Sequence, residues 1–172
     1  MTELAPLTEY AEYIRWVATH KAPQINNMPV CPYAKRNVEK GRVMFEVFEL
    51  THDALFDRVK KLLASDDLDL ITCIEPTKDR LSHDDVVELA GEVNKEFLRS
   101  SLVHGVSLHP DDPFELDGLF TRRAPHPTVQ LMKWEVGTET HEKLLPTGYY
   151  KHWTEEHDRM TFPGLTLDEV PS

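Results

Sequence analysis

An alternation of strand and helix patterns between Val43 and Leu108 most strongly constrains the fold of this chain. Three short runs rich in Val, Ile, Leu and Phe are separated by two longer segments with apolar residues at helical spacing. The runs are Val43–Leu50, Leu68–Ile74 and Leu102–Leu108. Strands joined by helical crossovers run in the same direction with right-handed connections. This β-α-β-α-β pattern therefore predicts an α/β fold, or an α+β sandwich, around a largely parallel central sheet.

The segments between and before these runs carry helix signals. Thr51–Ala64 repeats Leu and Val at helical spacing, and Ser82 with Asp85 forms a capping box at the start of a second helix. An N-terminal helix is expected over residues 8–20, and a short helix over residues 33–40.

The C-terminal part is harder to assign. Residues 129–136 fit a strand or a helix, and the prolines just before them favour a helix. From about residue 146 the chain is aromatic and charged without a regular period, which predicts an irregular tail that wraps the domain or joins a second copy in a homo-oligomer. We expect one domain over residues 1–172, with a core at about 8–136 and an extension at about 137–172.

The charge balance limits the class of partner. The chain has 30 Asp and Glu against 19 Lys and Arg, a formal net charge of -11 at pH 7. This charge argues against nucleic acid or an anionic membrane as a partner. No apolar run reaches the ~20 residues that a membrane-spanning helix needs. Two cysteines, Cys31 and Cys73, form neither a disulfide framework nor a zinc spacing, so a cytoplasmic location is expected.

The segment from His109 to Thr128 is rich in proline and carries many ionisable groups. Proline fixes φ and lacks an amide donor, so this backbone is expected to be rigid and irregular, and it follows a strand. Such segments often carry binding and catalytic groups. We expect His109 to act as a general base or metal ligand, Asp111 to orient it, and Arg122 and Arg123 to bind an anion.

A metal site is one specific form of this hypothesis. His109, Asp111 and His126 have the composition of a two-histidine, one-carboxylate triad, which would suit a mononuclear iron or copper centre with open coordination positions. Their spacing is shorter than usual for such triads. The alternative for His109 is a histidine that caps a turn.

Cys31 is the candidate nucleophile. It precedes the short helix expected over residues 33–40, where the helix dipole favours a thiolate. The sequence Cys31-Pro-Tyr-Ala is similar to a redox turn in which Ala34 replaces the second cysteine, so a single nucleophile or thiolate ligand remains. The alternative is a small buried apolar residue, which is the role expected of Cys73.

Three motifs together resemble a bacterial domain-of-unknown-function family, the one numbered 1415. The motifs are VCPYAK at residues 30–35, SLHPD at 107–111 with Phe114, and TRRAPHPT at 121–128, and their order and spacing agree over residues 12 to about 136. The resemblance implies a cytoplasmic α/β protein and brings no established activity. It singles out Cys31, His109, Asp111 and Arg123, whereas the family tends to have Asn and Tyr in place of Arg122 and His126.

The sequence thus predicts a small enzyme whose cleft lies at the strand ends and which acts on a small anionic substrate. Arg122 and Arg123 would hold the anion, His109 would act as base, and Cys31 would supply a nucleophile or a thiolate ligand. An iron or copper oxidoreductase is the sharper form of this hypothesis. The alternative is a non-catalytic binding or accessory module that docks a protein partner through the 109–128 loop, with Cys31 buried and inert.

Overall fold

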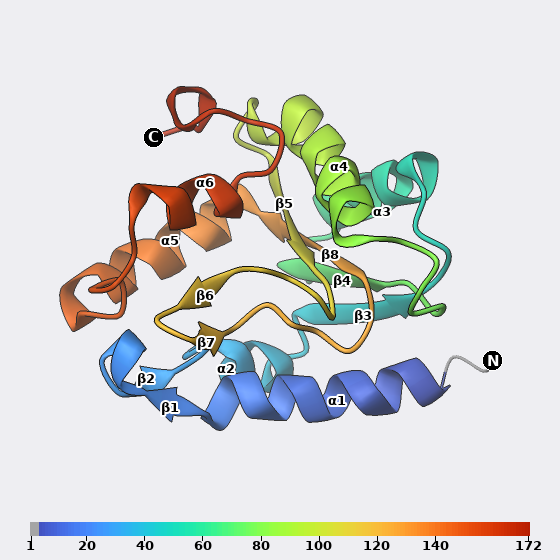
Figure 1. Ribbon diagram of the computed structural model, residues 1–172. Coiled ribbons are helices and arrows are strands. Elements are labelled where there is room, and N and C mark those ends of the chain that lie inside the picture. Colours follow the sequence, from blue (N-terminus) through green and yellow to red (C-terminus); the bar gives the residue numbers. More distant parts are fainter. Residues whose placement is uncertain (1–3) are drawn as a thin grey trace.

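The computed structural model describes residues 4–172, which build a four-stranded sheet with helices on both faces (Figure 1). The strand order is β3-β4-β8-β5, and the strands are β3 (Val43–Val47), β4 (Leu70–Ile74), β5 (Val103–Leu108) and β8 (Thr128–Lys133). β3 and β4 are parallel, whereas β8 is antiparallel to both β4 and β5. Two small hairpins lie outside this sheet: β1 (Lys21–Ala22) with β2 (Met28–Pro29), and β6 (Glu115–Leu116) with β7 (Leu119–Phe120).

The expected α/β class is confirmed, but the sheet is mixed rather than largely parallel. The three strands expected from the sequence point the same way, and β8 lies between β4 and β5 and runs against them. The helix favoured over residues 129–136 is therefore wrong for most of that segment. Val129 pairs with Cys73 on one side and with Ser107 on the other. Two hydrogen-bonded ladders satisfy this backbone, so helix begins only at Trp134.

The helices expected near residues 33–40, 51–64 and 82–100 are confirmed, the N-terminal helix begins at Leu4 rather than at residue 8, and the last two helices were not expected. The helices are α1 (Leu4–Thr19), α2 (Ala34–Glu39), α3 (His52–Ala64), α4 (His83–Val93), α5 (Trp134–Leu144) and α6 (Glu155–Thr161). A π-helical turn (Asn94–Leu98) extends α4, and 3₁₀ turns occupy Pro23–Ile25, Leu145–Thr147 and Leu167–Glu169. The capping box of Ser82 and Asp85 is present. Within residues 4–172, no helix has the length and apolar character that crossing a membrane requires.

One face of the sheet is closed by α3 and α4. The odd-numbered residues of β4 and β8, such as Ile71 and Leu131, pack there against Leu55 of α3 and Val86 of α4, and all of them are fully buried. Each such side chain stabilises the fold by about 1.5–3 kcal/mol relative to an exposed position. Cys73 lies in this core, as expected.

The other face is covered by α1, α2, α5 and the C-terminal extension. The part expected to be an irregular tail contains α6, and it is anchored to the domain through Asn94. The Asn94 amide donates hydrogen bonds to the carbonyls of Gly105 and Pro163, and its oxygen accepts from the Gly105 amide. Gly164, at φ +81°, lies against Gly91 of α4 so closely that a Cβ would overlap the Gly91 backbone. The extension therefore wraps its own domain.

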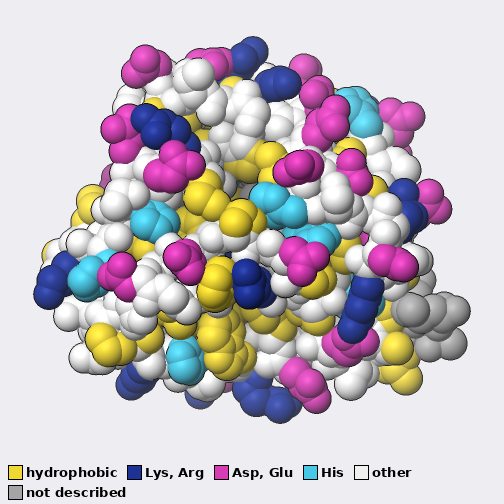
Figure 2. Space-filling view, viewed as in Figure 1, with side chains coloured by type: hydrophobic (Ala, Val, Ile, Leu, Met, Phe, Trp, Pro, Cys, Tyr) yellow, Lys and Arg dark blue, Asp and Glu magenta, His cyan; other side chains and the backbone are white. Residues whose placement is uncertain are grey.

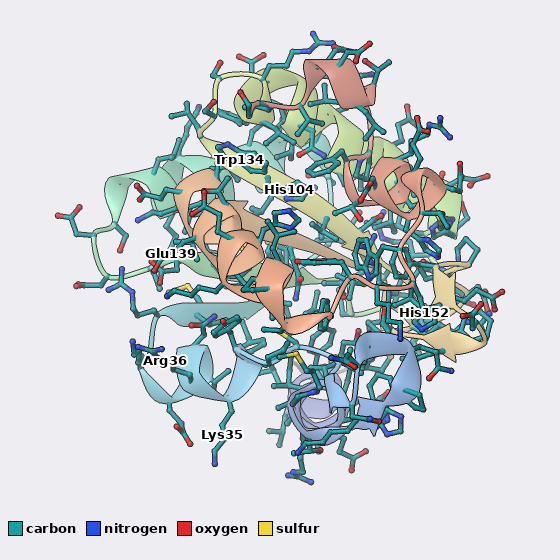
Figure 3. All side chains as sticks on the ribbon, turned by 90° about the vertical axis from the view of Figure 1, so that its left-hand side faces the viewer. Lys35, Arg36, His104, Trp134, Glu139 and His152 are labelled. Atoms are coloured by element: carbon teal, nitrogen blue, oxygen red, sulfur yellow. The ribbon has the colours of Figure 1, made fainter. Side chains whose placement is uncertain are left out.

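His104 also links the extension to the sheet. The side chain is only 4% exposed, its Nε2 lies 2.6 Å from the carbonyl oxygen of Thr161, and its ring stacks on Phe162. In Figure 3 it lies on β5 close to Trp134 of α5, with a ring separation of 5.9 Å. Burial lowers the pKa of His104 from 6.5 to about 4.

We predict that His104 makes the protein less stable as the pH falls from 6.5 to about 4. In this window the unfolded chain binds a proton at this histidine and the folded chain does not. The free energy of unfolding should decrease by about 3 kcal/mol from this group alone. Urea titrations of His104→Gln across the window should show a decrease smaller by that amount, while the exposed control His141→Gln should behave like the wild type. If the free energy of unfolding fell equally with pH in both variants, the prediction would be wrong.

Candidate functional site

A cavity of about 320 Å³ lies over the sheet face opposite α3 and α4. Its floor consists of alternate residues of all four strands, among them Phe45, Thr72, Val106 and Gln130. Its walls come from α1, the segment at residues 30–34, α5 and residues 149–153. Figure 3 looks toward this side of the molecule, with α5 above α2. On the face seen in Figure 2, acidic side chains are scattered and hydrophobic side chains gather toward the middle.

The position of the cavity differs from the expected cleft at the strand ends. The even-numbered residues of β4 and β5 face away from α3 and α4, and they need cover from another layer. α1, α2 and the extension surround this face without filling the space above it. The space therefore remains over the middle of the sheet.

Cys31 lines the cavity. Its amide donates to the Val17 carbonyl, 2.7 Å away, which ties the segment to α1. The side chain is accessible, yet protein surrounds the sulfur closely enough that desolvation raises the pKa of the thiol. Hydrogen bonds from the amides of Tyr33 and Ala34 act in the opposite direction and are the weaker effect. Cys31 is therefore an accessible thiol that is mainly protonated at neutral pH.

Arg122 lines the same cavity. It donates hydrogen bonds to the Met160 carbonyl and the Thr161 hydroxyl, and its guanidinium lies 3.8 Å above the Phe114 ring. It makes no ion pair within residues 4–172. Burial lowers the pKa of Arg122, and the more distant Asp112 carboxylate opposes this only in part. A largely enclosed cation without a carboxylate partner is uncommon, because desolvation disfavours the charge.

Aromatic side chains enclose these two residues. The Tyr13 hydroxyl donates to the Thr121 carbonyl at 2.8 Å, and the Tyr149 hydroxyl donates to the Val30 carbonyl. Desolvation raises the pKa of Tyr150 to about 12, so its phenol is neutral at pH 7. The indole Nε1 of Trp153 is buried without a hydrogen-bond partner in the described chain. No local motif marks these residues as a site, because they come from both ends of the chain.

His109 lies outside the cavity and caps a turn. It is 5% exposed, its Nδ1 accepts a hydrogen bond from the Asp111 amide at 3.0 Å, and its Nε2 donates to the Leu81 carbonyl at 2.9 Å. Both ring nitrogens are thus occupied by backbone, which corresponds to the structural alternative. Asp111 contributes its backbone here, and its exposed side chain does not orient the imidazole.

Asp112 is the buried carboxylate of this turn. It is 2% exposed, one oxygen accepts from the Phe114 amide, and the other lies 3.6 Å from Nε2 of His83. Burial raises its pKa. Sequence reasoning favoured the neighbouring Asp111, and the turn geometry that selects Asp112 is invisible in the sequence.

Arg123 and His126 both lie outside the cavity. Arg123 is exposed, lies 3.5 Å above the Phe120 ring and donates to the Asp112 carbonyl. His126 is fully buried, with Nδ1 hydrogen-bonded to the Glu75 carbonyl at 2.9 Å.

The structure does not gather His109, Asp111 and His126 into a metal site. Both ring nitrogens of His109 and Nδ1 of His126 form hydrogen bonds with the backbone, and Nε2 of His126 lies 3.6 Å from the Glu9 carboxylate. More generally, no three His, Cys, Asp or Glu side chains of residues 4–172 are arranged to hold a metal ion. Of the residues predicted from the sequence, Cys31 and Arg122 line the same cavity.

Comparison of the chain with protein-family models, with curated proteins and with solved structures gives no match. The resemblance to the bacterial family therefore stays a prediction. Of the residues that it singles out, Cys31 lies in the cavity, whereas Arg123 lies on the surface next to the cavity residue Arg122.

We predict that native protein reacts with iodoacetamide at Cys31 and not at Cys73. The Cys31 thiol is accessible but has a raised pKa, so its rate at pH 7 should be lower than that of free cysteine and should rise steeply above pH 9. Cys73 should react only after unfolding. Mass spectrometry of the wild type and of Cys31→Ser measures both sites, and native labelling of the variant would contradict this assignment.

Proposed function

We propose that this protein binds a small organic anion in the cavity and that Arg122 holds the negative charge of this ligand. The observation that carries the proposal is the enclosed Arg122 guanidinium, which has backbone, hydroxyl and aromatic partners but no carboxylate within ion-pair distance among residues 4–172, Asp112 acting on it only from further away. Its planar N–H groups suit a carboxylate or phosphate. A bound anion would supply the missing countercharge and offset the desolvation of the cation.

The lining supports a ligand with an apolar or aromatic body. Five aromatic side chains line the cavity: Phe45, Phe114, Tyr149, Tyr150 and Trp153. Ligand sites typically combine such a lining with a few placed polar groups, and a volume of about 320 Å³ lies at the small end of their range. The ligand class supported best is an aromatic or branched monocarboxylate.

The thiol of Cys31 supports a catalytic use of the same cavity. It is the nucleophile among the lining residues, and a raised pKa means that the thiol must lose its proton before or during attack. We therefore propose Cys31 as the candidate nucleophile of this cavity, for a bound ligand whose carbonyl carbon carries a leaving group; a free carboxylate carries none and would be bound without reaction. The metal-dependent form of the hypothesis is not adopted, because the three suggested ligands do not share a site.

The protein-docking alternative has less support from the 109–128 loop. The apolar side chains of this loop are buried inside the domain: Phe114, Leu116, Leu119 and Ala124. A docking loop would present such side chains to a partner. The loop instead builds the wall that carries Arg122.

We predict that phenylacetate, used as the probe, raises the Tm of the wild type and that Arg122→Met weakens its binding at least tenfold. Loss of charge-assisted hydrogen bonds to the carboxylate is the reason. Isothermal titration calorimetry measures Kd for the variant and for the matched control Arg123→Met, which removes the adjacent exposed arginine and should bind like the wild type.

The neutral analogue phenylacetamide separates charge recognition from apolar binding, and it should bind the wild type at least tenfold more weakly than phenylacetate. The proposal fails if Arg122→Met binds phenylacetate as tightly as the wild type, or if the amide and the acid bind equally. Circular dichroism checks that both variants are folded.

A further inference from the structure

A polar pair lies in the middle of the cavity floor. Strand register places Phe45, Thr72, Gln130 and Val106 side by side across the four strands. The two central members, Thr72 and Gln130, are polar. The flanking row on one side of this face is apolar at both strands, with Leu70 and Met132. On the other side Ile74 pairs with Thr128, whose hydroxyl donates to the His126 carbonyl and so has a partner.

The hydroxyl of Thr72 has no hydrogen-bond partner in residues 4–172. The Thr72 side chain is 0% exposed, and its Oγ1 is buried. The neighbouring Gln130 is half-buried, and its amide forms no side-chain hydrogen bond with the described chain. A buried hydroxyl without a partner is unfavourable in a core, where valine has the same shape. Its presence on a cavity floor points to a ligand group as its partner.

Arg122 lies at one end of this polar row. The Thr161 hydroxyl accepts from Arg122, and the Thr161 carbonyl lies 2.6 Å from Nε2 of His104, which precedes Val106 on the same face of β5. The guanidinium therefore lies beside β5, the edge strand. Neighbouring strands are about 4.8 Å apart, so Gln130 and Thr72 follow at roughly one and two strand spacings from β5.

We propose that Thr72 and Gln130 form a second polar subsite, which selects organic anions that carry an uncharged hydroxyl or carbonyl at the far end of an apolar body. This inference rests on the proposed function, since it assumes that Arg122 holds the anionic end. The hydroxyl of Thr72 and the amide of Gln130 can both donate and accept, so either group of the ligand is satisfied. The row contains no charged residue, which disfavours a second carboxylate.

Calorimetric titration with two probes tests the subsite. Phenylacetate has the anion and the ring, and 4-hydroxyphenylacetate adds a hydroxyl at the opposite end of the ring. We expect the wild type to bind the hydroxylated acid about tenfold more tightly, because a site with unpaired polar groups discriminates against a ligand that leaves them unpaired.

Thr72→Val should abolish this preference and change Kd for phenylacetate by less than about twofold. Because the variant removes a buried hydroxyl without a partner, its Tm in the absence of ligand should not fall, so it remains a folded test protein. Thr140→Val is the matched control: Thr140 lines the cavity from α5, outside the polar row, and this variant should keep the preference.

The outcomes separate this inference from the proposed function. If the wild type binds both acids equally, or if Thr72→Val keeps the preference, the subsite is wrong while anion binding stands. If neither acid binds the wild type, the proposed function fails and the subsite fails with it. A preference lost in Thr72→Val and kept in Thr140→Val supports the subsite.

Discussion

The insertion of β8 between β4 and β5 is the constraint on which the rest of the structure depends. The chain leaves β5, turns through His109, forms the β6–β7 hairpin and returns to pair on both sides along β8. The return path forces Arg122 to lie beside the end of β5, where its carbonyl accepts a hydrogen bond from the His109 amide. The same pairing places Gln130 next to Thr72. The anion-binding residue and the polar pair are thus both consequences of one antiparallel insertion.

The two faces of the sheet have different packing. α3 and α4 close one face with side chains such as Leu55, Val59 and Ala90, which are fully buried. The other face is covered by elements from both ends of the chain, and their side chains leave a cavity. Well-packed interiors contain few voids larger than a water molecule, so the closed face supplies stability while the open face has room for a ligand.

The open face also contains groups that a stable core would not retain. Arg122 lacks a carboxylate partner, and Thr72 Oγ1 and Trp153 Nε1 lack hydrogen-bond partners within residues 4–172. Each buried polar atom without a partner costs about 1–3 kcal/mol. These three groups line one cavity together with Cys31, and departures from complete pairing are expected at functional sites. Two further buried polar atoms without partners in residues 4–172, the Tyr10 hydroxyl and Nε2 of His126, lie outside this cavity.

Local signals in the sequence determined the first four helices, the three co-directional strands and the capping box of Ser82 and Asp85, because spacing and caps act within a few residues. They also identified Cys31 and the pair Arg122 and Arg123 as candidates. Only the tertiary structure decided that residues 128–133 form a strand, since pairing on two sides outweighed a local preference. It also decided that Arg122 rather than Arg123 enters the cavity, and that His109 is a turn cap. These outcomes depend on contacts between segments far apart in the chain, which residue spacing does not encode.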